Sequence, residues 1–388
     1  MPNAYILKAV RTPGCKAKRG KFANCRPDYL ATVALKALLE KTGVDPQDIE
    51  DVILGCSFPE AEQGMNVGRM VALSSGLPYQ VPGQTVNRFC SSGLQSISMA
   101  AERIMAGFAD CIVAGGVESM TSVPMGGNKF AANPDLVDSR PESYSSMGIT
   151  AEKVAERYDV SREDQDRFGL QSNERALSAI AEGKFSEEIV PVPVERTGLE
   201  GDERVATTEV VDIDDGPRKT SLEKMARLKS PFKAGGSVTP GNSSQMTDGA
   251  AVTLVVSDQY LKKVKQDPMA RFVAYDVKGC PPEIMGIGPS LAIPGVLEET
   301  GMNIDSIDLF EINEAFASQA LYCLRELGLS QEKVNVNGGA IALGHPLGCT
   351  GAKLTTTLLH EMQRRQAKRG IVSMCIGGGM GAAGIFEL

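Results

Sequence analysis

Three side chains in this 388-residue sequence have the right chemistry to act as nucleophile, base and acid, and the first is Cys90. Cys90 follows Val86-Asn87-Arg88-Phe89 and precedes Ser91-Ser92-Gly93, after which apolar residues recur at helical spacing up to Gly107. This pattern places Cys90 at a helix start, where free N–H groups and the positive end of the helix dipole favour a thiolate. Burial as a small packing residue is the alternative, because free cysteines are among the most buried residues.

A catalytic histidine would have to be His345 or His360, the only two in the chain. His345 lies in the glycine-rich stretch Gly338–Gly348, and Pro346 biases it toward an extended conformation. That setting is unusual for a core histidine and natural for one that meets a substrate. His360 falls on an expected helix, Lys353–Arg364, beside Glu361, so we expect it on the surface.

Cys375 ends an apolar run and is followed by the glycine-rich stretch Gly377–Gly381. Backbone N–H groups in such a stretch can stabilise an oxyanion. A nucleophile and a base suffice for acyl transfer, whereas making or breaking a carbon–carbon bond beside a thioester needs another group to exchange a proton with the α-carbon. A cysteine can do this if its pKa is lowered. The three residues therefore indicate more than a simple cysteine hydrolase.

Strands and helices alternate around these residues, which predicts an α/β fold with parallel strand pairs and covering helices. The first part of the chain supplies expected strands at Ala4–Lys8, Val52–Leu54 and Cys111–Gly116, and an expected helix at Tyr29–Lys41.

The last part of the chain repeats the first. The matched stretches are Leu39–Gly43 with Leu297–Gly301, Val86-Asn87 with Val336-Asn337, and Cys111–Gly116 with Ile371–Gly377. Two copies of one α/β unit would pack as a pseudo-symmetric pair. Their equivalent loops would meet at the junction, where ligands commonly bind.

From about Met120 to Lys233 the chain is polar and charged, which predicts an insertion between strands of a more regular core. It contains one clear helix, Arg162–Ala181, with Ser161 and Asp164 spaced as a capping box and Gly183 as its end. A local basic cluster follows, consisting of Arg218, Lys219, Lys224, Arg227, Lys229 and Lys233. This cluster could hold a phosphorylated ligand or be a solvated loop.

The composition of the chain narrows the class of protein. The net charge of -8 disfavours nucleic acid, and no apolar run approaches membrane-spanning length. The nine cysteines are scattered and never spaced C-x-x-C, which fits neither a disulfide scaffold nor a metal site. Because the N-terminus reads directly into a strand and Phe386-Glu387-Leu388 is not a peroxisomal address, we expect a cytoplasmic protein.

Taken together, the chain resembles the thiolase family, and most closely the 3-ketoacyl-CoA thiolases (acetyl-CoA acyltransferases). The stretches that carry the resemblance are Val10–Pro13, Val86–Leu94, Met147–Glu152, Gly241–Ser244, Asn313–Ala317, Gly344–Gly348 and Cys375–Gly381. The resemblance implies a duplicated βαβαβαββ core in five layers (α-β-α-β-α). It implies an N-terminal core domain (1–119 and 234–262), an inserted CoA-binding loop domain (120–233) and a C-terminal core domain (263–388).

The resemblance also implies roles for the catalytic residues. Cys90 would be acylated; His345 would activate it and, with a water held by Asn313, bind the thioester oxygen. Cys375 would exchange the proton of the α-carbon. The N–H groups of Cys90 and Gly377 would form the second oxyanion hole.

For the substrate, the resemblance implies pantetheine contacts at Ser244, Ala315 and Phe316, an acyl-pocket residue at Met147 and a nucleotide contact at Arg218. The basic cluster becomes a CoA-phosphate surface. Coenzyme A would be a substrate, with no permanently bound cofactor. The chain would form a homodimer or homotetramer, with a β-oxidation enzyme as a possible partner.

One departure bears on the substrate. Short-chain acetoacetyl-CoA thiolases carry a histidine just before the Met-Gly pair, where this chain has Ser146, preceded by Ser145. This favours the degradative type with broad chain length, as do Met285–Pro289 and Met380–Gly384, over an acetyl-CoA C-acetyltransferase. A ketosynthase would need a second histidine, for which His360 is badly placed. A non-catalytic thiolase-like lipid-binding protein would form no acyl-enzyme.

Overall fold

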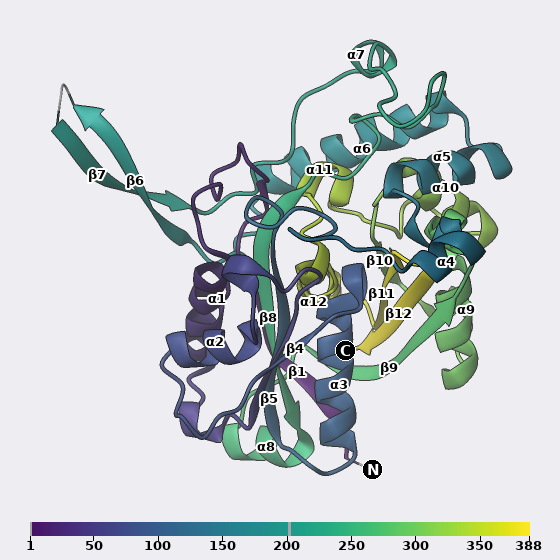
Figure 1. Cartoon of the computed structure of the whole chain (residues 1–388). Coiled ribbons are helices and arrows are strands. Elements are labelled where there is room, and N and C mark those ends of the chain that lie inside the picture. Colours follow the sequence, from purple (N-terminus) through teal and green to yellow (C-terminus); the bar gives the residue numbers. More distant parts are fainter. Residues whose placement is uncertain (1, 201–202) are drawn as a thin grey trace.

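Ten strands form one sheet system in the computed structural model, which describes residues 2–200 and 203–388 (Figure 1). The strand order is β10-β11-β12-β9-β1-β8-β5-β3-β4, and β2 pairs with β8. The strands are β1 Ala4–Arg11, β2 Cys15–Lys16, β3 Asp51–Gly55, β4 Gln84–Val86, β5 Cys111–Ser119, β8 Thr247–Ser257, β9 Ala270–Gly279, β10 Leu309–Ile312, β11 Arg369–Ile376 and β12 Met380–Glu387.

The sheet system is duplicated, as the internal repeat predicted. In the first half, β3 lies parallel to β4 and β5, and β8 runs antiparallel to β5 and β1. In the second half, β10 is parallel to β11, and β12 runs antiparallel to β11 and β9. Val334 forms a parallel bridge with Phe310, where β4 pairs with β3 in the first half. The antiparallel pair β1–β9 joins the halves.

The repeated Leu-Glu-x-Thr-Gly stretches end corresponding helices. Helix α1 (Pro27–Thr42) stops at Gly43 and α9 (Gly288–Thr300) stops at Gly301, with φ of 61° and 66°. These left-handed caps require glycine or cost a side-chain clash. A short 3-10 turn then leads each copy into β3 or β10. The repeated sequence therefore encodes the same helix stop and strand entry twice.

Three apolar layers separate the helices from the two half-sheets. Helices α1 and α2 (Val67–Ser74) cover the outer face of the first half, and α9 and α10 (Ala317–Glu326) cover that of the second (Figure 1). Helices α3 (Ser92–Met105) and α12 (Leu347–Arg365) lie between them. Neighbouring residues alternate between layers: Val52 and Leu54 pack outward, whereas Ile53 packs into the central layer. This is the five-layer arrangement that the resemblance implied.

Helices α3 and α12 approach each other closely because glycines lie at their contact. A Cβ atom at Gly93 would lie 2.7 Å from the backbone nitrogen of Ala352, and one at Gly351 would lie 2.3 Å from that of Leu94. A larger residue at either position would push the helices apart. Since Cys90 directly precedes α3, this contact fixes the nucleophile candidate against the second half.

The surface position expected for His360 was wrong. Helix α12 starts at Leu347, six residues earlier than expected, and lies between the two half-sheets. His360 is therefore buried, and its Nε2 lies 3.1 Å from the carbonyl oxygen of Ala9. Glu361, also buried, accepts from Asn337 Nδ2 and pairs with Arg364 and Arg365. A charged neighbour in the sequence therefore predicts exposure only when one face of the helix is exposed to solvent.

The segment between β5 and β8 adds no strand to the ten-stranded path within the described residues. It contains α4 (Pro134–Ser139), α5 (Met147–Arg157), α6 (Arg162–Ala181), β6 (Val192–Glu200), β7 (Glu203–Val211) and α7 (Leu222–Ala226). Helix α6 has the predicted bounds, and Ser161 accepts the N–H of Asp164 as its cap. The β6–β7 hairpin, which the sequence did not suggest, projects from the body of the molecule (Figure 1).

Two short helices complete the chain, α8 (Asp258–Val264) and α11 (Ala340–Leu343). Among the helices of the described residues, none is both long and apolar enough to cross a membrane.

Candidate active site

Cys90 sits on a sharp turn between β4 and α3. The preceding residue, Phe89, has a φ of 43°, a left-handed conformation that is strained for an aromatic residue. The turn is held by hydrogen bonds from Phe89 N–H to Asn87 Oδ1 (2.8 Å) and from Ser92 Oγ to the Phe89 carbonyl (2.6 Å). A strained strand-to-helix turn of this kind presents its central side chain toward the opposing loops.

Burial raises the pKa of the Cys90 thiol to about 12, although hydrogen bonds from the N–H groups of Gly377 and Cys90 lower it. The helix start was expected to favour a thiolate. Here the apolar central layer around the sulfur outweighs the dipole and the two N–H groups. The resting cysteine is therefore a neutral thiol at pH 7.

His345 lies on the bend between α11 and α12 and is buried. Its Nε2 is 3.3 Å from Asn313 Nδ2, and its Nδ1 is 2.5 Å from Thr350 Oγ1. Burial, with the positive charge of Lys353, lowers the pKa of His345 to about 3. The imidazole is therefore neutral and available as a base. Asn313 is fully buried, and its Oδ1 makes no hydrogen bond to any described residue.

Cys375 lies near the end of β11 and is fully buried. Burial raises the pKa of its thiol well above the usual range, and the nearby Cys90 raises it further. The raised pKa follows from burial, because the thiol packs in an apolar cluster with Met147, Ala315, Phe316 and Met285. At rest Cys375 is therefore a neutral thiol that can donate its proton only to a strongly basic carbon, and the thiolate left behind is a strong base.

The two halves bring these groups together. Strand β11 and helix α12 both contact the Phe89–Ser91 turn that carries Cys90. Gly377, the residue after β11, directs its N–H at the Cys90 sulfur. Because Asn313 follows β10, which pairs with β11, the groups of the second half gather at one sheet end facing Cys90.

The residues expected to contact pantetheine also lie side by side. Ser244 N–H donates to the Ala315 carbonyl (2.9 Å), and Ala317 N–H donates to the Asn242 carbonyl (2.8 Å). Met147, at the start of α5, shares an apolar cluster with Ala315, Phe316 and Cys375. The acyl-pocket and pantetheine candidates therefore surround the same thiol.

Arg218 lies away from this apolar cluster. It is exposed, donates to the Pro240 carbonyl (3.0 Å) and borders a depression of about 200 Å³. Lys224, Asn173 and Gly241 line the same depression. All six members of the basic cluster are exposed, although Lys233 pairs with Glu156, so the cluster lies where an anionic group could meet it.

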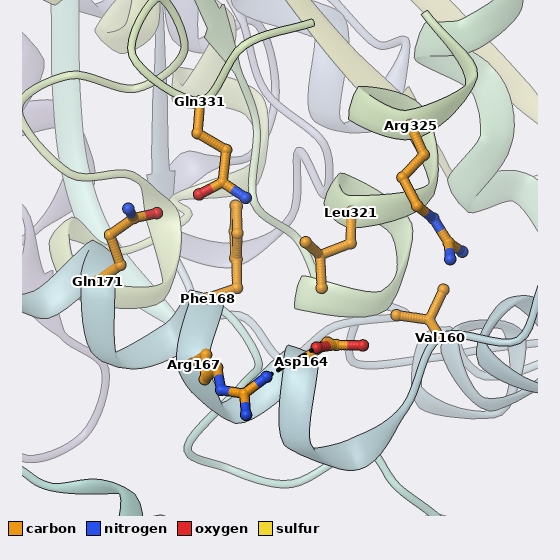
Figure 2. A pocket seen from close by; sticks show the side chains of 8 residues that line it. All are labelled: Val160, Asp164, Arg167, Phe168, Gln171, Leu321, Arg325 and Gln331. Carbon is orange, nitrogen blue, oxygen red and sulfur yellow. Dashed lines mark hydrogen bonds and ion pairs between the residues drawn. The ribbon is translucent and has the colours of Figure 1, made fainter. Parts of the chain in front are cut away.

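A further cavity of about 450 Å³ lies between α6 and α10 and contains none of the predicted site residues (Figure 2). Its lining residues are Val160, Asp164, Arg167, Phe168, Gln171, Leu321, Arg325 and Gln331. Arg167 pairs with Asp164 at 3.3 Å, and Arg325 donates to the Tyr158 carbonyl. Its cations thus already have partners, and it has no nucleophile.

Two buried residues near the site were not found from the sequence. Glu118 accepts the N–H of Ser57 (2.8 Å), the N–H of Gly348 (2.7 Å) and Gln63 Nε2 (2.5 Å). It thereby ties a loop of the first half to the first turn of α12, and burial raises its pKa. The sequence feature that could have identified Glu118 is a charged residue within the otherwise apolar and small-residue strand Cys111–Ser119. Thr350 gave no comparable signal.

A duplicated five-layer α/β core with two cysteines and a histidine near its junction defines a class of acyl-transferring enzymes. Family models described as "Thiolase, N-terminal domain" and "Thiolase, C-terminal domain" match residues 4–259 and 266–388. The chain belongs to the thiolase family, and it is an acyltransferase.

Among its relatives, a 3-ketoacyl-CoA thiolase of Bacillus subtilis is 52% identical, with all of both chains covered. A peroxisomal 3-ketoacyl-CoA thiolase 1 of Arabidopsis thaliana is 46% identical over 99% of this chain and 87% of the relative. Two solved structures are similar throughout. The Bacillus anthracis acetyl-CoA acetyltransferase has a TM-score of 0.90 at 41% identity, covering 100% of this chain and 99% of the other. The dimeric peroxisomal thiolase of Saccharomyces cerevisiae has a TM-score of 0.89 at 39% identity, covering 99% and 97%.

Proposed function

We propose that this chain is a 3-ketoacyl-CoA thiolase that cleaves 3-ketoacyl-CoA with CoA, giving acetyl-CoA and a shortened acyl-CoA in fatty-acid β-oxidation. The names of the Bacillus subtilis and Arabidopsis relatives support this activity. The observation that carries it is the meeting of the Cys90 turn with the end of β11, where Gly377 N–H faces the Cys90 sulfur beside Cys375.

In the first step, the Cys90 sulfur attacks the 3-keto carbon while its thiol proton passes to His345 Nε2, because the raised pKa of Cys90 and the lowered pKa of His345 leave no free thiolate before the attack. The bond between C2 and C3 then breaks, leaving the acyl group on Cys90 and the electron pair on C2 of acetyl-CoA. Cys375 gives its proton to C2. Its raised pKa is tolerable here, because an enolate of a thioester is far more basic than a thiolate.

In the second step, the thiol of CoA attacks the acyl group on Cys90. The Cys375 thiolate takes the proton of that thiol, and Cys90 leaves and recovers its own proton from His345. The N–H groups of Cys90 and Gly377 face the negative oxygen that forms on the acyl carbon. His345, with a water held by Asn313, binds the thioester oxygen of acetyl-CoA in the first step.

The substrate would extend from this centre toward the inserted segment. Met147 lines the acyl group, while Ser244, Ala315 and Phe316 contact pantetheine, which their shared cluster and backbone pairing support. Arg218 and the exposed basic cluster bind the nucleotide and phosphates of CoA. This assignment keeps the proposed domains: core 1–119 with 234–262, inserted loop domain 120–233, and core 263–388.

An acetyl-CoA C-acetyltransferase that condenses two acetyl-CoA molecules is the second candidate. The similarity to the Bacillus anthracis acetyl-CoA acetyltransferase favours it. Ser145 and Ser146, in place of the histidine of short-chain enzymes, favour the first candidate.

We further propose a homodimer, supported by the dimeric yeast structure, with a homotetramer and a β-oxidation partner enzyme as further possible assemblies. A cytoplasmic location is supported by the bacterial relative, whereas the Arabidopsis relative is named peroxisomal.

Thiolysis rates test the function. Purified protein with CoA should cleave a medium-chain 3-ketoacyl-CoA at least as fast as acetoacetyl-CoA, and Cys90→Ala should abolish both rates. A strong preference for the four-carbon substrate would make the second candidate correct. Absence of cleavage with either substrate would contradict both.

A further inference from the structure

Thr350 occupies a specific place beside the candidate base. It lies on the first turn of α12, five residues after His345, and is almost fully buried. Its Oγ1 makes two short contacts, 2.5 Å to His345 Nδ1 and 3.1 Å to the carbonyl oxygen of Pro346. Both distances lie within hydrogen-bonding range.

Counting protons assigns the direction of these bonds. The Thr350 hydroxyl donates its single proton to the carbonyl oxygen of Pro346, which can only accept. The Thr350 oxygen must then accept from His345, which requires a proton on Nδ1. In a neutral imidazole this leaves Nε2 without a proton. Nε2 faces Asn313 Nδ2, an amide donor, which agrees with a bare nitrogen there.

We propose that Thr350 is a positioning residue that fixes His345 in the Nδ1–H tautomer, so that Nε2 is the nitrogen that takes the Cys90 proton. Its role in catalysis rests on the proposed function, but the tautomer itself does not. Thr350 touches His345 and no reacting atom. It acts by fixing which nitrogen carries the proton and how the ring is oriented.

The second histidine supplies an internal contrast. His360 Nε2 lies 3.1 Å from the carbonyl oxygen of Ala9, so that nitrogen must carry a proton. The two histidines of the chain are therefore assigned opposite tautomers by their hydrogen-bond partners. Since the chain has only these two, imidazole signals can be resolved without crowding.

Nitrogen NMR of protein labelled with 15N-histidine tests the tautomer directly. We expect one ring protonated on Nδ1 and one on Nε2 at pH 7, with His360→Gln removing the Nε2–H signal set and so assigning it. A wild-type His345 protonated on Nε2 alone would overturn the proposal. This result is independent of any activity.

Kinetic measurements on three variants test whether Thr350 matters for catalysis. Thr350→Val keeps the shape but removes the hydroxyl, and we expect kcat to fall about 10- to 100-fold while KM stays within about twofold. Thr350→Ser should restore kcat to within about threefold of the wild type. Thr355→Val is the matched control, because Thr355 is buried on the same helix and bonds only the Gly351 carbonyl.

In Thr350→Val the His345 spectrum should change from pure Nδ1–H to a mixture or to Nε2–H, and in Thr355→Val it should not. An unchanged His345 tautomer with unchanged kcat in Thr350→Val would overturn the role of Thr350. If the protein showed no thiolase activity but the spectra behaved as expected, the proposed function would fail and the tautomer assignment would stand.

Discussion

The two halves of the molecule share one strand order, yet they contribute different chemistry. The loop after β4 in the first half carries Cys90, and the loop after Val334 in the second half carries His345. The second half also supplies Asn313, Cys375 and Gly377. Duplication thus places two equivalent sets of loops face to face, with the candidate nucleophile in one set and the candidate proton-transfer groups in the other.

The end of strand β5 shows what the first half does instead. Where β11 ends in Cys375 and Ile376, β5 ends in Glu118 and Ser119. Glu118 accepts the N–H of Gly348, next to the loop of His345, and so supports the other half. The first half thus holds the candidate nucleophile and a carboxylate with a structural contact, and the second half holds the residues for which we propose acid–base roles.

The largest expected effects separate the two tasks of the second half. Cys375→Ala should lower thiolysis about 10³-fold or more, because C2 of acetyl-CoA needs the proton of Cys375. Transfer of an acetyl group from acetyl-CoA to a second thiol should fall less than about tenfold, because it breaks no carbon–carbon bond and a thiol is acidic enough to exchange its proton without Cys375. His345→Ala should lower both by about 10³-fold. Stopped-assay product analysis distinguishes the reactions, and Cys280→Ser, a partly exposed thiol, serves as control. Equal losses in both reactions for Cys375→Ala would contradict the role of Cys375 as the group that exchanges a proton with C2.

A pH series of unfolding measurements tests the neutral base. Unfolded His345 binds a proton below its ordinary pKa of about 6.5, whereas the folded residue does so only below about 3. Between these values the unfolded state binds more protons, so stability falls as the pH falls. His345 alone should cost about 3 kcal/mol between pH 7 and pH 4. In urea titrations, the free energy of unfolding of His345→Gln should therefore depend less steeply on pH than that of the wild type. The contribution of His360, whose pKa burial also lowers, should remain in the variant. Coinciding slopes would contradict the neutral imidazole.

The support from the first half predicts a stability effect. Glu118→Gln replaces one acceptor oxygen with an amide that faces N–H donors, so we expect a loss of about 2 kcal/mol in the free energy of unfolding. Glu298→Gln, on the exposed end of α9, should change it by less than about 0.5 kcal/mol. Chemical denaturation of both variants measures the difference. Equal stabilities would mean that Glu118 does not hold the halves together.

The smallest effect concerns the insertion rather than either half. Ser146 is exposed and makes no cap hydrogen bond at the start of α5, so Ser146→His should leave stability nearly unchanged. We expect the ratio of four-carbon to medium-chain thiolysis to rise a few-fold, or about 1 kcal/mol. Matched assays with Ser143→His, a neighbouring partly buried position, provide the control. An unchanged ratio would mean that residues other than Ser146 select the chain length of the substrate.

Much of the fold followed from local sequence. Gly43 marked a helix end correctly, Gly301 ends the corresponding helix of the repeat, and Arg162–Ala181 was bounded by its own cap and stop. The duplication was visible because both copies kept these local signals. The β6–β7 hairpin was missed, since only its base, with Val192, Val194 and Val211, packs into the core. His360 was misplaced because whether a helix has an open face depends on the partner sheets.

The sequence proposed residues that the structure brings together, but it did not predict their electrostatics. Glycine-flanked loops identified Cys90, His345 and Cys375, but both thiols proved to have raised pKa values, because burial depends on packing from the other half. Thr350 and Glu118 were invisible for the same reason. Each acts through one contact that only the assembled halves create.

The division between the halves rests on Cys90 carrying the acyl group, and mass spectrometry tests this most directly. Protein mixed with acetyl-CoA, quenched in acid and digested should show one acetyl group, on the peptide that contains Cys90, and none in Cys90→Ala. An acetyl group on Cys375 instead, or no adduct in protein that cleaves 3-ketoacyl-CoA, would contradict the account.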